Sequence, residues 1–192
     1  MFSDFSLIIL AGGHGSRMGR DKALLTMPDG RTFLQHQLDK GRALGITDIL
    51  LSGSRTETEG VRVIPDNLPD SGPLGGLEAC LPVISHEKAL VLGVDTPLVP
   101  VEELTRLMIR ARSNAEPVTV LRSPDGLQPL IGVYDRSVLP IIREQLTLGR
   151  RKLLLTLERS GYCVCESGGA GLCNINTPAD YAAIPQSLPE NT

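Results

Sequence analysis

The sequence predicts an α/β fold with an open, mostly parallel (mixed) sheet and helices on both faces. Short apolar runs alternate along the chain with stretches of helical periodicity, which is typical of β-α-β units. Several of the apolar runs carry no polar alternation, as expected of strands that helices cover on two sides. In such sheets a ligand binds beyond the carboxyl ends of the strands, where the strand order reverses.

The predicted strands are short runs rich in leucine, isoleucine and valine, a composition that favours buried strands over loops. They lie at residues 7–10, 49–51, 61–64, 89–92, 118–121 and 131–134.

Helices are predicted where apolar residues recur every three or four positions. The clearest stripe consists of Leu104, Leu107, Met108 and Ala111. A second helix is expected at 137–148, with one broad face made of Val138, Leu139, Ile142, Gln145 and Leu146. Thr177 followed by Pro178 predicts the start of a third helix, because threonine is a favourable N-cap and proline fits the first helical position.

The length and charge restrict the class of protein. The 192 residues predict a single domain over 1–184, followed by a flexible tail, "PQSLPENT", at 185–192. A net charge of −3 and an aromatic content of 3% do not indicate a nucleic-acid-binding protein. No run approaches the roughly 18–20 apolar residues of a membrane span, and no basic segment opens the chain, so we expect a cytoplasmic protein without membrane attachment.

The cysteines, Cys80, Cys163, Cys165 and Cys173, are expected to be reduced thiols. The last three lack the paired CxxC spacing or nearby histidines of common zinc sites, so idle or buried thiols are favoured over a metal site.

The stretch "LAGGHGSRMGRDK", residues 10–22, concentrates glycine and positive charge at the end of the first predicted strand. Glycine is costly to order, so such a cluster indicates a backbone that approaches another group closely or adopts positive φ. Backbone N–H groups of a glycine-rich turn can bind an anion together, and basic side chains add net charge. The predicted anion-binding loop therefore contains Gly12, Gly13, Gly15 and Gly19 with His14, Arg17, Arg20 and Lys22.

Two common phosphate-binding patterns do not fit this loop. The Walker pattern requires serine or threonine after its lysine, whereas Ala23 follows Lys22. The dinucleotide fingerprint, counted from Gly13, requires glycine where Met18 stands. It also expects an acidic residue after the second strand, where this chain has Ser52.

Two aspartates follow predicted strands. Asp95 ends an apolar strand, and because hard divalent cations prefer oxygen ligands, it is the predicted metal ligand. The alternative, that Asp95 only caps the next helix, is weakened because that helix starts several residues later, near Glu102. Asp66 precedes a Gly-Pro-Leu-Gly-Gly segment, 72–76, which is expected to be a loop that could close over a base or ribose; the alternative is an aspartate in a turn.

The loop resembles the signature of the small α/β nucleotidyltransferases, L-A-G-G-x-G-x-R-M-G-x-D-K, at every fixed position. Within them the chain looks most like the molybdenum cofactor guanylyltransferases, through "SGPLGGL", "DTPLVP", "QPLIGVYDRSVLPIIREQLTLGRRKLLLTLE" and "CNINTPADY". The resemblance implies a Rossmann-like nucleotidyltransferase fold with a nucleotide-binding N-terminal half and an acceptor-binding C-terminal half. It also implies GMP transfer from GTP to the terminal phosphate of (molybdenum-)molybdopterin with release of pyrophosphate, and Mg²⁺ as cofactor. Transient contacts with molybdenum cofactor biosynthesis proteins and recipient molybdoenzymes are implied as well.

The same resemblance assigns the site residues. The nucleotide side comprises Leu10, Ala11, Gly12, Gly13, Lys22, Ser52, Asp66 and Asp95. The catalytic residues are Arg17, Lys22 and Asp95, with Asp95 also the metal ligand. The acceptor side comprises Gln128, Arg150, Arg151, Asn174 and Asn176. Ser52 departs from the family pattern, in which asparagine is expected.

Two features of the acceptor side have alternatives. Asn174 and Asn176 flank one apolar residue, so both amides could face one side of a strand, although Asn176 could instead serve only the following helix. The basic run 150–152 could meet an acceptor phosphate or be solvated surface.

Charge determines what such a site has to do. A phosphate monoester with close to two negative charges and an NTP with about four repel each other, and a low-dielectric cleft magnifies the repulsion. Mg²⁺, Arg17 and Lys22 together supply about four positive charges, so in-line attack at the α-phosphorus needs no protein nucleophile or strong general base. Three alternatives stay open: CTP as the nucleotide, a sugar phosphate as the acceptor, and a non-catalytic nucleotide- or cofactor-binding protein.

Overall fold

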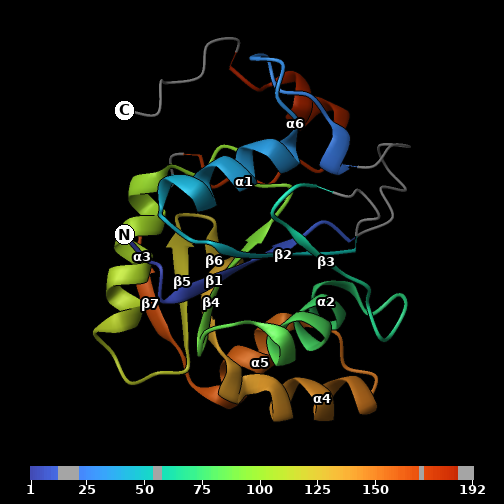
Figure 1. The fold of residues 1–192 in the computed structure, drawn as a ribbon, viewed down its shortest axis with the longest axis vertical. Helices are drawn as coiled ribbons and strands as arrows, with labels where there is room; N and C mark the ends of the chain where they lie inside the picture. Colours follow the sequence, from blue (N-terminus) through green and yellow to red (C-terminus); the bar gives the residue numbers. More distant parts are fainter. Residues whose placement is uncertain (13–21, 54–57, 169–170, 186–192) are drawn as a thin grey trace.

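A mixed sheet runs through the middle of the molecule (Figure 1). The computed structural model describes residues 1–12, 22–53, 58–168 and 171–185, and within them seven strands form one sheet in the order β3-β2-β1-β4-β6-β5-β7. They are β1 (Phe5–Leu10), β2 (Asp48–Ser52), β3 (Arg62–Ile64), β4 (Lys88–Gly93), β5 (Val118–Ser123), β6 (Gly126–Asp135) and β7 (Cys163–Glu166). β1 to β4 are parallel, β6 is antiparallel to its neighbours, and β7 is parallel to β5. The predicted open, mostly parallel mixed sheet is confirmed.

Each predicted strand lies within or beside an observed one, and the differences have local causes. β6 starts at Gly126, well before the predicted 131. Gly126, Gln128 and Pro129 interrupt the apolar pattern there, yet residues 126–128 pair with β5. The sequence does not predict β7, whose four residues include two cysteines and which forms by pairing with β5 at the sheet edge.

Helices cover both faces of the sheet, and the strand residues alternate between them. Leu7 and Ile9 of β1 pack with α1 (Phe33–Ala43) and α3 (Val101–Arg112) on one face. Ile8 and Leu10 pack on the other face with α2 (Gly72–Cys80), α4 (Leu139–Thr147) and α5 (Leu153–Ser160). Figure 1 shows α1 and α6 (Pro178–Ala182) on one side of the sheet and α4 and α5 on the opposite side. Strands covered on both faces explain the continuous apolar runs.

The predicted helices are present. The stripe at 104–111 is the buried face of α3. Residues 136–147 form a 3-10 turn, η3 (Arg136–Val138), that continues into α4. Thr177 caps α6 because its side chain accepts a hydrogen bond from the Asp180 N–H, and Pro178 begins the helix. Two further 3-10 turns are η1 (Lys22–Leu24) and η2 (Leu81–Val83).

Two expectations are wrong. The Gly-Pro-Leu-Gly-Gly segment, 72–76, is the first part of helix α2, not a loop. Its glycines permit close helix packing, since a Cβ on Gly76 would lie 2.6 Å from Ser52 Oγ and 2.7 Å from Leu10 Cδ2. Asn174 and Asn176 lie on an irregular segment, not a strand, because the segment pairs with the turn after β4 through a single hydrogen bond, from the Ile175 N–H to the Asp95 carbonyl.

The structure also bears on the cysteines and on membrane-spanning helices, and some of the predicted residues lie outside its described ranges. All four cysteines are free thiols, and Cys80 and Cys165 are buried. Among the described helices, none combines the length and the apolar character required to cross a membrane. Gly13, Arg17 and the tail from 186 onward lie outside the described residues.

Candidate active site

The carboxyl ends of three parallel strands meet at one edge of the sheet. Leu10 is in register with Ser52 of β2 and with Gly93 of β4, so the segments that follow these strands leave the sheet together. The Ala11 N–H donates to Ser52 O at 2.9 Å, and the Val94 N–H donates to Leu10 O at 3.0 Å. This edge is where ligands bind in open α/β sheets.

Gly12 and Gly53 bring two backbones into close contact at this edge. A Cβ on Gly53 would lie 2.2 Å from Gly12 Cα, and Gly53 has φ +76°, so both space and backbone conformation require glycine there. The close approach expected at Gly12 is therefore made, in this structure, to another part of the chain.

Ser52 and Asp66 form a polar pair beside these glycines. The Ser52 Oγ donates to Asp66 Oδ1 at 2.6 Å, and Asp66 Oδ2 would lie 3.8 Å from a Cβ on Gly12. Asp66 is half-buried. Four of the predicted nucleotide-side residues, Leu10, Gly12, Ser52 and Asp66, are thus brought together.

Lys22, Asp95 and Asn176 converge from three distant segments. Lys22 Nζ donates to Asn176 Oδ1 at 2.6 Å and lies 3.8 Å from Asp95 Oδ2. The Lys22 and Asp95 side chains are 18% and 19% exposed, so the pair is largely withdrawn from water while one side stays open. The resemblance assigns Lys22 and Asp95 to the nucleotide side and Asn176 to the acceptor side. The structure places all three in one group.

The C-terminal helix positions Asn176. The Asp180 carboxylate accepts from the N–H groups of Asn176 and Thr177, at 2.9 and 2.8 Å, and these bonds lower the pKa of Asp180. The Tyr181 hydroxyl donates to Thr26 O at 2.5 Å, which ties α6 to the chain that follows Lys22. Asn176 therefore serves the following helix and also contacts Lys22, so the two interpretations are compatible.

The donor set at Asp95 is compatible with a hard cation. Burial raises the pKa of Asp95, and the Lys22 ammonium opposes that shift. A buried carboxylate with one ammonium beyond hydrogen-bond distance is a favourable place for a further positive charge. Among the described residues no group of three or more His, Cys, Asp or Glu side chains gathers.

The remaining predicted acceptor residues lie apart. Gln128 sits near the tip of the β5–β6 hairpin, where its Nε2 donates to Ser123 Oγ at 3.0 Å. Leu130, further along β6, lies against Gly93, so the start of β6 is on the same edge as Asp95. Asn174 is exposed, as are Arg150 and Arg151 in the turn between α4 and α5. No hydrogen bond or ion pair between described residues joins these arginines to Lys22, Asp95 or Asn176.

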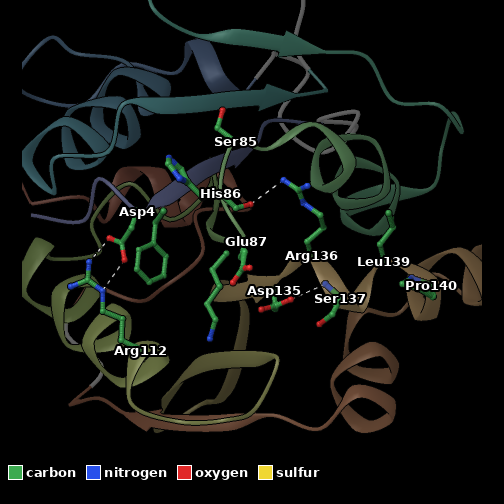
Figure 2. Close-up of a pocket in the computed structure, with 12 residues that line it drawn as sticks. Asp4, Ser85, His86, Glu87, Arg112, Asp135, Arg136, Ser137, Leu139 and Pro140 are labelled. Carbon is green, nitrogen blue, oxygen red and sulfur yellow. Dashed lines mark hydrogen bonds and ion pairs between the residues drawn. The ribbon is translucent and has the colours of Figure 1, made fainter.

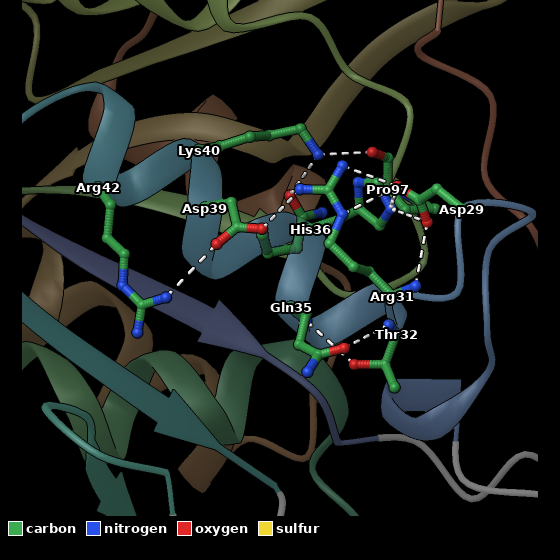
Figure 3. Close-up of polar contacts among 10 residues, drawn as sticks. Asp29, Arg31, Thr32, Gln35, His36, Asp39, Lys40, Arg42 and Pro97 are labelled. Atoms are coloured by element: carbon green, nitrogen blue, oxygen red, sulfur yellow. Dashed lines mark hydrogen bonds and ion pairs between the residues drawn. The ribbon is translucent and has the colours of Figure 1, made fainter. Parts of the chain in front are cut away.

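The sequence reading missed two functional candidates on α1, Gln37 and Lys40. Gln37 is fully buried and Lys40 is 4% exposed, and both side chains reach the turn that follows β4; Figure 3 shows Lys40 directed at Pro97. Burial lowers the pKa of Lys40 to about 7. The signal was present in the sequence, because Gln37 shares the buried face of the helix with Leu34 and Leu38.

A hollow of about 1260 Å³ lies at the opposite edge of the sheet (Figure 2). It is lined by the amino ends of β1 and β4, and two of its arginines donate hydrogen bonds to other lining residues. Arg112 Nε donates to Asp4 Oδ2 at 3.2 Å, and Arg136 donates to His86 O at 3.0 Å. Nothing in this hollow matches the convergence at Lys22 and Asp95.

The chain is similar to known proteins over most of its length. Residues 7–160 match the model of the MobA-like NTP transferase domain. The chain is 30% identical to a probable molybdenum cofactor guanylyltransferase of Carboxydothermus hydrogenoformans, over 94% of this chain and 95% of that protein. It is 31% identical to the molybdenum cofactor guanylyltransferase of Vibrio cholerae, over 94% and 91%. The crystal structure of molybdopterin-guanine dinucleotide biosynthesis protein A from Archaeoglobus fulgidus has the same fold, with a TM-score of 0.76, 22% identity and coverage of 93% and 95%.

Proposed function

The chain belongs to the MobA-like NTP transferases, and from this we propose that it transfers GMP from GTP to the terminal phosphate of molybdopterin, with or without bound molybdenum, and releases pyrophosphate. The observation that carries the proposal is the convergence of Lys22, Asp95 and Asn176 at the carboxyl edge of the sheet. A lysine beside a buried carboxylate suits a reaction in which polyanions must be brought together.

The nucleotide side is proposed to lie where β1, β2 and β4 end. The loop with Gly13 and Arg17 would receive the triphosphate beside Leu10, Ala11 and Gly12, and the paired Ser52 and Asp66 would receive the ribose or base. Lys22 neutralises phosphate charge. Asp95 is the residue that would hold Mg²⁺, which when bound neutralises the charge of the triphosphate and of the leaving pyrophosphate.

The acceptor side is proposed to lie toward Asn176. With its Oδ1 accepting from Lys22, Asn176 keeps its Nδ2 group as a donor for an anion. Asn174 and Gln128 would add polar contacts, and Arg150 and Arg151 would bring positive charge from the turn between α4 and α5. A phosphate oxygen of the acceptor is already ionised at neutral pH, so the chain needs to orient it and not to deprotonate it.

This division assigns the nucleotide to the N-terminal half and the acceptor to the C-terminal half of a domain over 1–184. The Lys22–Asn176 hydrogen bond joins the two halves, and this supports one shared site. Contacts with the proteins that deliver molybdopterin or accept the product are part of the same proposal.

A substrate assay tests the proposal. The protein is incubated with Mg²⁺, molybdopterin and either GTP or CTP, and pyrophosphate and the dinucleotide product are measured. Pyrophosphate release and a guanine dinucleotide with GTP are expected. Release with CTP alone would make the protein a cytidylyltransferase, and turnover of glucose-1-phosphate would make it a sugar-phosphate enzyme. GTP binding without any release would leave a non-catalytic binding protein.

A further inference from the structure

Helix α1 turns two buried polar side chains toward the segment that carries Asp95. Burying an amide or an ammonium group is costly unless it forms hydrogen bonds. For Gln37 and Lys40 the partners are main-chain carbonyls of a distant turn, 93–97, which begins at the end of β4. The helix therefore does more at this place than cover the sheet with apolar side chains.

The contacts hold the turn on both sides of Asp95. Gln37 Nε2 donates to Gly93 O at 2.7 Å and to Thr96 O at 3.0 Å. Lys40 Nζ donates to Pro97 O at 2.5 Å (Figure 3). It also donates to Gln37 Oε1 at 3.2 Å, so the two side chains stabilise each other.

Asp95 itself is held from the opposite direction. Its main-chain carbonyl accepts from the Ile175 N–H at 2.8 Å, while its neighbours' carbonyls point to α1. The turn is thus fixed between α1 and the segment that leads to Asn176. With the backbone on both sides of Asp95 fixed, the carboxylate is directed toward Lys22.

We propose that Gln37 and Lys40 are positioning residues of the active site, which fix the turn 93–97 and thereby keep the Asp95 carboxylate in place for a divalent cation. This inference rests on the proposed function, because it takes Asp95 as the metal ligand. Partners that orient a metal ligand commonly change metal affinity by roughly 10- to 100-fold when they are lost.

The chain offers matched controls for a purely structural effect. Gln145 of α4 is also fully buried, and its Oε1 accepts from Thr156 Oγ1 at 3.4 Å, away from the site. Lys88 also donates its Nζ to a main-chain carbonyl, that of Ala111 at 3.0 Å, at the opposite edge of the sheet. Gln145→Met removes a buried amide and Lys88→Met a part-buried ammonium group, and neither change touches the turn 93–97.

The experiment measures GTP affinity by calorimetry, once with Mg²⁺ and once with EDTA, for wild type, Gln37→Glu, Lys40→Met and both controls. The ratio of the two affinities is the gain due to the metal. We expect Gln37→Glu, which keeps the size but loses the amide donor, to reduce this gain by roughly 10-fold or more, with unchanged affinity in EDTA. Lys40→Met should reduce it in the same direction, and the controls should keep it.

Hydrogen–deuterium exchange provides a readout without any ligand. The amides of residues 94–96, 98 and 99 should exchange faster in Gln37→Glu than in wild type, and not in Gln145→Met. Equal exchange, or a metal-dependent gain equal to that of wild type, would overturn the positioning role. A wild-type protein that binds no GTP would instead refute the proposed function, so the two failures are distinguishable.

Discussion

Replacing Lys40 by methionine is expected to flatten the pH dependence of stability. Burial lowers the pKa of Lys40 from 10.5 to about 7 in the folded protein, while Asp39 partly favours the charged form and Arg31 disfavours it. In the unfolded chain the pKa returns to its ordinary value, so between these two values the unfolded state binds more protons. The stability of the wild type therefore rises with pH through this window and is lowest below it.

The magnitude follows from the two pKa values. A difference of one bound proton changes the free energy of unfolding by about 1.4 kcal/mol per pH unit. Lys40 is half-protonated in the folded protein at about pH 7. Integration from there to about pH 9 gives an increase of about 2 kcal/mol in the free energy of unfolding. Methionine carries no charge and removes this gain. It also leaves Pro97 O without its donor, which costs about 1–3 kcal/mol at every pH.

The assay is urea unfolding of wild type and Lys40→Met at several pH values from about 7 to about 9. Groups that do not interact with Lys40 cancel in the difference. The pKa of His36, which burial and then the Lys40 charge lower, lies below the window. The difference in stability between the two proteins should grow by about 2 kcal/mol in favour of wild type across the window. Parallel curves would refute the reasoning, since Lys40 would then keep an ordinary pKa in the fold.

The other predictions concern the site. Lys22→Ala should lower turnover by about 10²- to 10³-fold with an unchanged melting temperature, and Lys88→Ala should leave turnover near wild type; full activity without Lys22 would remove it from the mechanism. Asp95→Asn should raise the Mg²⁺ concentration needed for half-maximal turnover, and an unaltered Mg²⁺ dependence would mean that another carboxylate holds the ion. Gly53→Ala should cost more stability than Gly60→Ala, because both have positive φ but only Gly53, of the two, faces another backbone within 4 Å. Equal losses in denaturant titrations would show that the close approach is unimportant.

Much of the architecture could be predicted because it depends on local pattern. Apolar runs without alternation predict strands covered on both faces, and the described β1, β2 and β4 have that environment. The cap at Thr177 is equally local, since threonine and proline act on the N–H groups of the next turn. The positions of Lys22 and Asp95 after strands one and four follow from the rule that parallel strands end at the same edge.

The sequence by itself determined the fold class, the carboxyl ends of β1 to β4 and the residue types that follow them, because these depend on periodicity and on the chemistry of single side chains. Only the tertiary structure decided that 72–76 is helical, that Gly12 lies against Gly53, and that Gln37 and Lys40 hold the turn of Asp95. The physical reason is that each of these depends on a contact between segments distant in the chain, and the free energy of such a contact exists only once the sheet has brought both partners together.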